Sequence, residues 1–243
     1  MNVLVNITFD GTNYHGTQIQ SNADTVFSRF QNALVKVLDK PTDIKACSRL
    51  DSGVHANCFY LSFYADDGLD VRHLHFALNY HLPPDIRALG AEVVPDGFHR
   101  RYSCKGKEYT YYMWNSHTDN PFLEKYYYRV PQKLNVDLMN EAAQHFVGTH
   151  DFTSFMASNS KITDCVRTVS YAKVERDGDM VKFIVCADGF LYNMVRIMAG
   201  TLIRVGRGYI AVNDVKTIIE SKDRQKAGVT VPAKGLFLSK VIY

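Results

Sequence analysis

The segment from Ser48 to Ala56 places one carboxylate in a turn of small residues, just ahead of an apolar strand. Asp51 is followed by Ser52 and Gly53, and such residues let the backbone turn tightly and present the carboxylate outward. Arg49, two residues upstream, is placed to keep that carboxylate ionised and oriented through a charge-assisted hydrogen bond. A carboxylate of this kind can act as a nucleophile or as a base. The same pattern also fits an ordinary turn between two strands.

The segment resembles the signature of the tRNA pseudouridine synthase A family, usually written G-R-T-D-A-G-V-H-A. It matches this signature at Arg49, Asp51, Gly53, Val54, His55 and Ala56. Further segments resemble elements of the same family in the same order, namely Phe9–Gly16, Asn79–Ile86, Phe98–Ser103, Lys105–Tyr111, Gly148–Phe155 and Phe190–Arg196. Together these matches are specific and span the chain.

The resemblance implies an isomerase that converts uridine in tRNA to pseudouridine. This reaction moves the attachment of uracil from N1 to C5 on the same ribose, so it is redox-neutral and adds no atom. It therefore requires neither a metal nor an organic cofactor. In agreement, the nine histidines show no HExxH or other metal-ligand spacing, and no glycine-rich phosphate loop occurs.

The resemblance also assigns roles to individual residues. Asp51 is the catalytic aspartate, which either attacks C1′ of the ribose or removes the C2′ proton. Tyr109 stacks on the target uracil and relays its C5 proton, and Arg196 pairs with Asp51. Arg49 and His55 complete the substrate site, with His55 a structural histidine rather than a proton carrier. From residue types alone, Tyr109 also fits a packed aromatic strand and Arg196 a side chain that reaches the surface.

A basic block follows the first half of the chain and flanks Tyr109. Its cations are Arg100, Arg101, Lys105 and Lys107. Such side chains contact the phosphates of an RNA stem, while base flipping delivers a single base to a catalytic site. The formal net charge of +3 permits an RNA partner without requiring one. The resemblance implies tRNA as that partner, uridines 38–40 of the anticodon stem-loop as targets, and a homodimer.

The hydrophobic periodicity of the first half follows the order β-α-β-β-α-β of a split βαβ unit. The predicted elements are a strand at Val3–Phe9, a helix at Asp24–Asp39, a strand leading into Asp51, a strand at Asn57–Ala65, a helix at Val71–Tyr80 and a strand at Ile86–Val94.

The second half repeats this scheme with longer insertions. The predicted strands are Lys107–Asn115, Val166–Glu175, Val181–Ala187 and Leu236–Tyr243, and the predicted helices are Val136–Val147, Leu191–Arg204 and Asp214–Ser221. Asn135 is a candidate cap of the first of these helices and Gly148 its stop signal. Asp177-Gly178 predicts a tight hairpin between the two middle strands.

Periodicity alone indicates an α+β protein. The resemblance implies the pseudouridine synthase fold, in which two ferredoxin-like split βαβ halves form a continuous mixed sheet with a central RNA-binding cleft. We expect the halves to be residues 1–104, with the catalytic aspartate, and residues 105–243, with the tyrosine and arginine of the site.

The sequence predicts a soluble, cytoplasmic protein. The five cysteines form no CxxC pair and lie among apolar neighbours, as expected of reduced core residues. Met1–Phe9 alternates like a strand and lacks the basic region of a signal peptide. No apolar run is long enough to span a bilayer.

Four positions differ from the family pattern. Thr17 stands where a tryptophan is usual, Ser48 replaces a glycine, Leu50 replaces a threonine and Ser52 replaces an alanine. These differences leave two alternatives open beside the isomerase: a diverged paralogue that binds or folds RNA with weak or no catalysis or modifies another RNA site, and a hydrolase of the glycosidic bond. A glycosidase would need a second carboxylate opposite Asp51. Asp10, Asp66, Asp67 and Asp85 are available for this.

Overall fold

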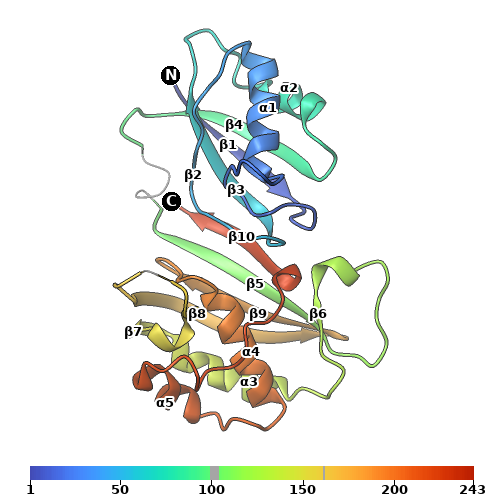
Figure 1. The fold of residues 1–243 in the computed structure, drawn as a ribbon, viewed down its shortest axis with the longest axis vertical. Helices are drawn as coiled ribbons and strands as arrows, with labels where there is room; N and C mark the ends of the chain where they lie inside the picture. Colours follow the sequence, from blue (N-terminus) through green and yellow to red (C-terminus); the bar gives the residue numbers. More distant parts are fainter. Residues whose placement is uncertain (99–103, 161) are drawn as a thin grey trace. The chain divides into compact units, whose positions relative to one another are not determined.

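The computed structural model describes residues 1–98, 104–160 and 162–243. The chain divides into two compact units (Figure 1). The first unit comprises Met1–Lys105 and Phe237–Tyr243, and the second comprises Gly106–Leu236. Each contains a sheet with both antiparallel and parallel neighbours and helices packed on it, so the predicted α+β class is confirmed.

The sheet of the first unit is built around β1 (Asn2–Phe9), which pairs antiparallel with both β3 (His55–Tyr64) and β4 (Ile86–Val94). On the other side of β3, β2 (Lys45–Ala46) pairs antiparallel, and β10 (Leu236–Ile242) pairs in parallel. Along residues 1–98 the element order is therefore that of the predicted split βαβ unit.

The strand expected to lead into Asp51 is shorter than predicted. β2 ends at Ala46, and at the next residue the Cys47 sulfur accepts the Tyr60 N–H at 3.4 Å. A side chain thus takes the place of a backbone acceptor there. The chain then approaches Asp51 without regular strand structure.

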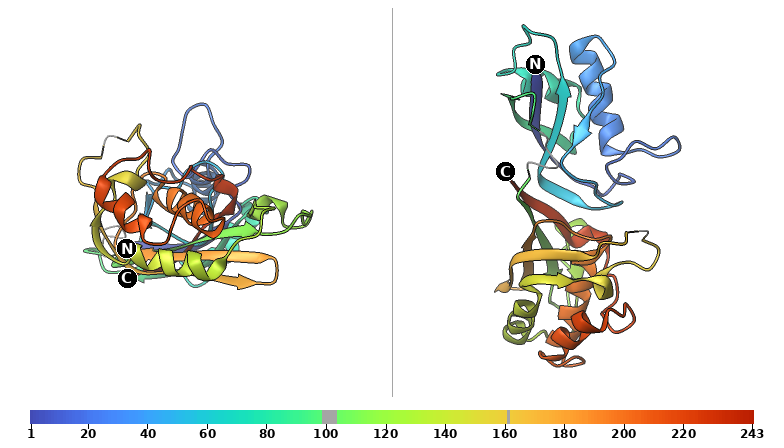
Figure 2. Two further views of the ribbon diagram at one scale, coloured as in Figure 1. Left: turned by 90° about the horizontal axis from the view of Figure 1, so that it is seen from below. Right: turned by 90° about the vertical axis from the view of Figure 1, so that its left-hand side faces the viewer.

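One face of this sheet forms the core of the unit. Val3, Val5 and Ile7 of β1 lie directly opposite Phe63, Leu61 and Phe59 of β3, and all six side chains are buried. Because strand side chains alternate between faces, these residues form one apolar surface. α1 (Val26–Leu38) lies beside this sheet (Figure 2, right). It covers the apolar surface, with the Phe27 ring 5.8 Å from that of Phe59. Burial of each large side chain contributes about 1.5–3 kcal/mol.

Local signals set the limits of the two helices. α1 begins after Thr25, whose hydroxyl accepts the Ser28 N–H at 3.3 Å in a capping box. It ends at Asp39, which adopts a left-handed conformation with φ 54°. α2 (Leu74–His81) starts later than predicted, since residues 71–73 form a turn.

In the second unit, strands run antiparallel in the order β5 (Gly106–Trp114), β9 (Met180–Ala187), β8 (Val166–Asp177) and β7 (Gly148–Asp151). β6 (Tyr128–Arg129) adds to β5 in parallel. The predicted β8–β9 hairpin is confirmed, and Gly178 at its turn has φ 58°. The sequence missed β7, because its four residues are too few and too polar to show strand periodicity.

The helices of this unit are α3 (Val136–Ala143), α4 (Met194–Gly206) and α5 (Asp214–Ser221). As predicted, Asn135 caps α3 by accepting the Leu138 N–H at 3.2 Å. α3 is shorter than expected, because the chain tightens into a 3₁₀ turn at Gln144–Phe146. α3 packs on β8, and α4 contacts both β5 and α3. Further 3₁₀ turns lie at Glu124–Tyr126, Thr153–Phe155 and Ala233–Gly235.

Across the residues that the structure describes, no helix combines the length and apolar character needed to cross a membrane.

A bulge in β4 is bridged by a side chain of α2. The β1–β4 register skips Leu89, between the pairs Asn6–Gly90 and Ile7–Ala88. Asn79 donates from Nδ2 to the Ala88 oxygen and accepts the Ala88 N–H at Oδ1, both at 2.8 Å. The side-chain amide of Asn79 thus pairs with Ala88 as the backbone of a neighbouring strand would.

We expect Asn79→Leu to lower the free energy of unfolding by roughly 2–4 kcal/mol, because it leaves both Ala88 groups unpaired. Urea unfolding measures this change. Asn32→Leu, at an exposed position of α1, is the control and should change stability little. Equal losses in the two variants would contradict the bridging role.

Candidate active site

Asp51 lies at the start of a tight turn. The Val54 N–H donates to the Asp51 oxygen at 3.2 Å, and Gly53 adopts φ 75°, a conformation that side chains disfavour. The turn expected from the small residues is therefore present. Asp51 itself is half-buried.

The loop between β1 and α1 lies directly on this turn. A Cβ atom added at Gly11 would lie 2.0 Å from the Val54 oxygen, and one at Gly16 would lie 2.7 Å from the Leu50 oxygen. Gly16 also has φ 82°. Both positions thus require glycine, because only backbone without a side chain can approach so closely.

Tyr14, between these glycines, holds the far side of the turn. Its backbone oxygen accepts the Gly53 N–H at 3.3 Å and the Ser52 hydroxyl at 3.2 Å. Its own hydroxyl donates to Asp85 Oδ1 at 2.6 Å. Burial and the Asp85 carboxylate raise the pKa of the Tyr14 phenol well above its usual range, so the proton stays on the tyrosine.

Asp85 therefore helps to fix the position of the loop. Besides binding Tyr14, it accepts the Asp10 N–H at its backbone oxygen, at 2.9 Å. Sequence reasoning placed Asp85 in a family motif and among the spare carboxylates, but it could not find this contact. The Tyr14 and Asp85 side chains are 71 residues apart along the chain.

His55 is fully buried in the first unit and stacks on Phe237 with ring centroids 4.5 Å apart. Its Nδ1 accepts the Gly11 N–H at 3.0 Å and lies 3.1 Å from Asp10 Oδ1. The Gly11 N–H points at Nδ1, so this ring nitrogen ties His55 to the loop. His55 thus holds the loop from inside.

Arg49 does not hold the Asp51 carboxylate as the two-residue spacing suggested. Its side chain is exposed, and among the described residues it forms no hydrogen bond or ion pair with Asp51. Leu50 between them is buried, and the backbone turns at Asp51. The Arg49 side chain thus lies in solvent beside the turn.

In the second unit, Tyr109 lies on β5 opposite Val185 of β9. Its buried ring meets Phe190 edge-to-face, with centroids 5.0 Å apart and planes at 81°. Tyr111 shares this face of β5 and donates from its hydroxyl to the Pro232 oxygen at 2.8 Å. Burial raises the pKa of Tyr111 well above its usual range, as expected of a core tyrosine.

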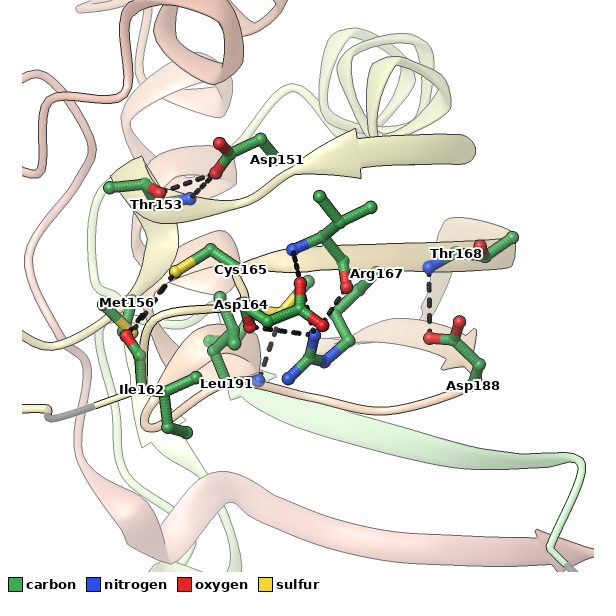
Figure 3. Close-up of polar contacts among 12 residues, drawn as sticks. Asp151, Thr153, Met156, Ile162, Asp164, Cys165, Arg167, Thr168, Asp188 and Leu191 are labelled. Atoms are coloured by element: carbon green, nitrogen blue, oxygen red, sulfur yellow. Dashed lines mark hydrogen bonds and ion pairs between the residues drawn. The ribbon is translucent and has the colours of Figure 1, made fainter. Parts of the chain in front are cut away.

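Residues that the sequence did not single out shape the segment leading to Phe190 (Figure 3). Asp188 Oδ1 accepts the Thr168 N–H at 3.0 Å and closes the end of the β8–β9 ladder. Arg167 donates to the Asp164 oxygen at 3.1 Å, and a Cβ added at Gly189 would lie 3.4 Å from its Nε. The chain after β9 is thereby fixed where Phe190 meets Tyr109.

Arg196 lies in the first turn of α4 and is half-buried. Its Nε donates to the Val231 oxygen and its Nη1 to Asn193 Oδ1, both at 2.7 Å. Asn193 precedes the helix in a left-handed conformation with φ 61°. The partners of Arg196 within its own unit are thus a carbonyl and an amide oxygen. Its expected pairing with Asp51 joins residues of different units and stays a prediction.

Sequence comparison then places this chain among known enzymes. A family described as tRNA pseudouridine synthase matches residues 6–103 and 142–243. The chain belongs to the tRNA pseudouridine synthase family. It is similar to tRNA pseudouridine synthase A of Clostridium acetobutylicum, with 45% identity over 242 residues that cover 100% of this chain and 99% of the relative. The enzyme of the same name from Thermoanaerobacter sp. (strain X514) is 43% identical over 242 residues, which cover 100% of this chain and 99% of the relative. The chain is also similar to tRNA pseudouridine synthase A 2 of Clostridium perfringens, with 40% identity over 243 residues that cover 100% of this chain and 99% of the relative.

As a member of the tRNA pseudouridine synthase family, the protein is an isomerase that acts on uridine, and the predicted family and enzyme class are confirmed. None of the five cysteines forms a disulfide bond in the structure. Over residues 1–98, 104–160 and 162–243, no three His, Cys, Asp or Glu side chains come together as candidate metal ligands.

Only part of the basic block of this pseudouridine synthase can be placed. Arg100 and Arg101 lie outside the described residues. Lys105 is exposed; its backbone N–H donates to the Ile242 oxygen at 2.7 Å and its Nζ to the Tyr243 oxygen at 3.3 Å. Lys107 lies half-exposed on β5.

We expect Gly16→Ala to lower kcat by about 10–100-fold, because the added methyl group pushes the loop off the Leu50 backbone and displaces Asp51. Pseudouridine formation in tRNA transcripts measures kcat, and a filter-binding assay measures the Kd for tRNA, which should change little. Gly90→Ala is the control, since a Cβ there meets nothing within 4 Å. Full activity of Gly16→Ala would show that the close approach is unimportant.

Proposed function

We propose that this isomerase converts uridines of the tRNA anticodon stem-loop to pseudouridine, with Asp51 as the catalytic residue. The observation that carries this proposal is the fixation of the turn at Asp51, whose backbone is held on both sides by the loop at 11–17. Such fixation suits a carboxylate that must meet one carbon of a bound ribose. The names of the relatives support tRNA as the substrate.

In the reaction the N1–C1′ bond breaks and a C5–C1′ bond forms, while C5 loses its proton and N1 gains one. Asp51 either attacks C1′ as a nucleophile or removes the C2′ proton.

The spare carboxylates of the first unit have other partners. Asp10 Oδ1 accepts from the N–H and hydroxyl of Thr12, and Asp85 binds Tyr14. Asp66 pairs with Lys40, and Asp67 with the N-terminal ammonium group. This favours chemistry with one carboxylate over the paired carboxylates of a glycosidase.

We assign Tyr109 to the target base, with its ring stacking on uracil and its hydroxyl taking part in removal of the C5 proton. The edge-to-face contact with Phe190 supports this role by fixing the ring plane. Arg196 completes the site as the partner of the Asp51 carboxylate. Arg49, exposed beside the turn, is free to contact the RNA, and His55 supports the turn from within.

For the remainder of the RNA we propose phosphate contacts from Arg100, Arg101, Lys105 and Lys107. We further propose that the protein works as a homodimer in the cytoplasm, where free thiols persist.

Asp51→Asn should retain tRNA binding and lower pseudouridine formation by more than about a thousandfold, since the amide is neither a nucleophile nor a base. The assay maps pseudouridine at single-nucleotide resolution in unmodified tRNA transcripts. Asp43→Asn, an exposed carboxylate of the same unit, should remain active.

Each other outcome contradicts a stated part of the proposal. Activity of Asp51→Asn would exclude the catalytic role of that residue. If the wild-type protein forms pseudouridine outside the anticodon arm, the proposed target site is wrong. If it binds tRNA and forms no product, the result favours an RNA-binding protein without catalysis. Release of free uracil would mark a hydrolase.

Tyr109→Phe keeps the ring and removes the hydroxyl, so we expect kcat to fall about 10²–10⁴-fold while KM changes little. Tyr109→Leu should also raise KM, because it removes the stacking surface. Steady-state kinetics on a tRNA transcript separate these effects. Tyr112→Phe, on the opposite face of β5, should behave like the wild type. If kcat is unchanged in Tyr109→Phe, the hydroxyl has no role in proton removal, and only the stacking role of Tyr109 remains.

A further inference from the structure

Thr17 binds the backbone of the residue that directly precedes Asp51. Both Thr17 and Leu50 are buried, with 1% and 7% of their surface exposed. The Thr17 hydroxyl oxygen accepts the Leu50 N–H at 3.0 Å, and the Thr17 N–H donates to the Leu50 oxygen at 3.1 Å. One threonine thus satisfies both backbone polar groups of Leu50.

The hydroxyl is needed because the backbone oxygen of Thr17 is already engaged. That oxygen accepts the Phe27 N–H at 3.1 Å, and the Gly16 oxygen accepts the Val26 N–H at 3.2 Å. Both N–H groups lie in the first turn of α1, where a helix lacks internal acceptors. Without the hydroxyl, the buried Leu50 N–H would lose its acceptor.

Thr17 and Tyr14 hold Asp51 from its two sides. Thr17 fixes Leu50 before it, and the Tyr14 oxygen accepts from Ser52 and Gly53 after it. A carboxylate anchored at only one side can shift, and a displacement of about 1 Å at a reacting group costs about 100-fold in rate.

We propose that Thr17 is a positioning residue for catalysis: its hydroxyl holds the Leu50 backbone and thereby places the Asp51 carboxylate for reaction. The inference rests on the proposed catalytic role of Asp51. It assigns Thr17 no contact with the substrate.

The contact also connects two departures from the family pattern. Thr17 stands in place of a usual tryptophan and Leu50 in place of a usual threonine, and the two residues touch. At position 50 only backbone atoms take part, so the contact depends on the hydroxyl at position 17.

The test compares Thr17→Val, which keeps the shape and removes the hydroxyl, with Thr17→Ser, which keeps the hydroxyl. We expect Thr17→Val to lower kcat about 10–100-fold with KM for tRNA within about twofold, and Thr17→Ser to remain within about threefold of the wild type. Hydrogen exchange at the Leu50 amide should accelerate in Thr17→Val alone.

Thr25→Val is the matched control. It removes another fully buried threonine hydroxyl of the same unit, which accepts a backbone N–H of α1 and not of the turn. Its Tm should fall about as much as that of Thr17→Val, whereas its kcat should stay near the wild-type value at temperatures where all variants are folded.

The inference is wrong if Thr17→Val keeps the wild-type kcat, or if Thr25→Val loses as much kcat as Thr17→Val. It is also wrong if Thr17→Ser folds but is inactive. If Thr17→Val does not fold, Thr17→Ala provides the same comparison. Activity in Asp51→Asn would refute the proposed function itself. An inactive Asp51→Asn with a fully active Thr17→Val would refute only the role of Thr17.

Discussion

The first unit depends on one close approach between two stretches of backbone, the loop at 11–17 and the turn at 50–54. Gly11 and Gly16 permit it, because no side chain fits between the two stretches. Hydrogen bonds from Tyr14 and Thr17 then fix the turn around Asp51. Backbone groups change position little without loss of the fold, so this arrangement gives a carboxylate a defined place at a low cost in side-chain entropy.

The same loop is tied to the core. Its oxygens cap the first turn of α1, whose apolar face covers β1 and β3. On its other side, Tyr14 binds Asp85 at the start of β4, and Asn79 joins α2 to the bulge in that strand. Displacement of the turn would therefore strain the packing of both helices. These contacts explain why an asparagine at position 79 and an aspartate at position 85 suit the Asn79–Ile86 segment.

The second unit holds Tyr109 and Arg196 in regular structure. Tyr109 is fixed by the β5–β9 ladder and by Phe190, and Arg196 by two oxygen acceptors near the start of α4. Such fixation suits the roles proposed for the two side chains, because a positioned group loses little freedom when a substrate binds. The altered residues of the first unit, Thr17 and Leu50, leave this arrangement untouched.

The sequence by itself determined the family, the α+β class and nearly all elements, because strand and helix periodicities are strong and caps such as Asn135 are local signals. It also predicted the turn at Asp51, which the structure confirms. Tertiary structure decided the rest. The bonds of Thr17 to Leu50, of Tyr14 to Asp85 and of Asp188 to Thr168 join residues at least 20 positions apart, and no local pattern specifies them. The exposure of Arg49 likewise follows from the turn and from the burial of Leu50. Spacing along the sequence shows that two residues are close in the chain, but it does not show where their side chains point.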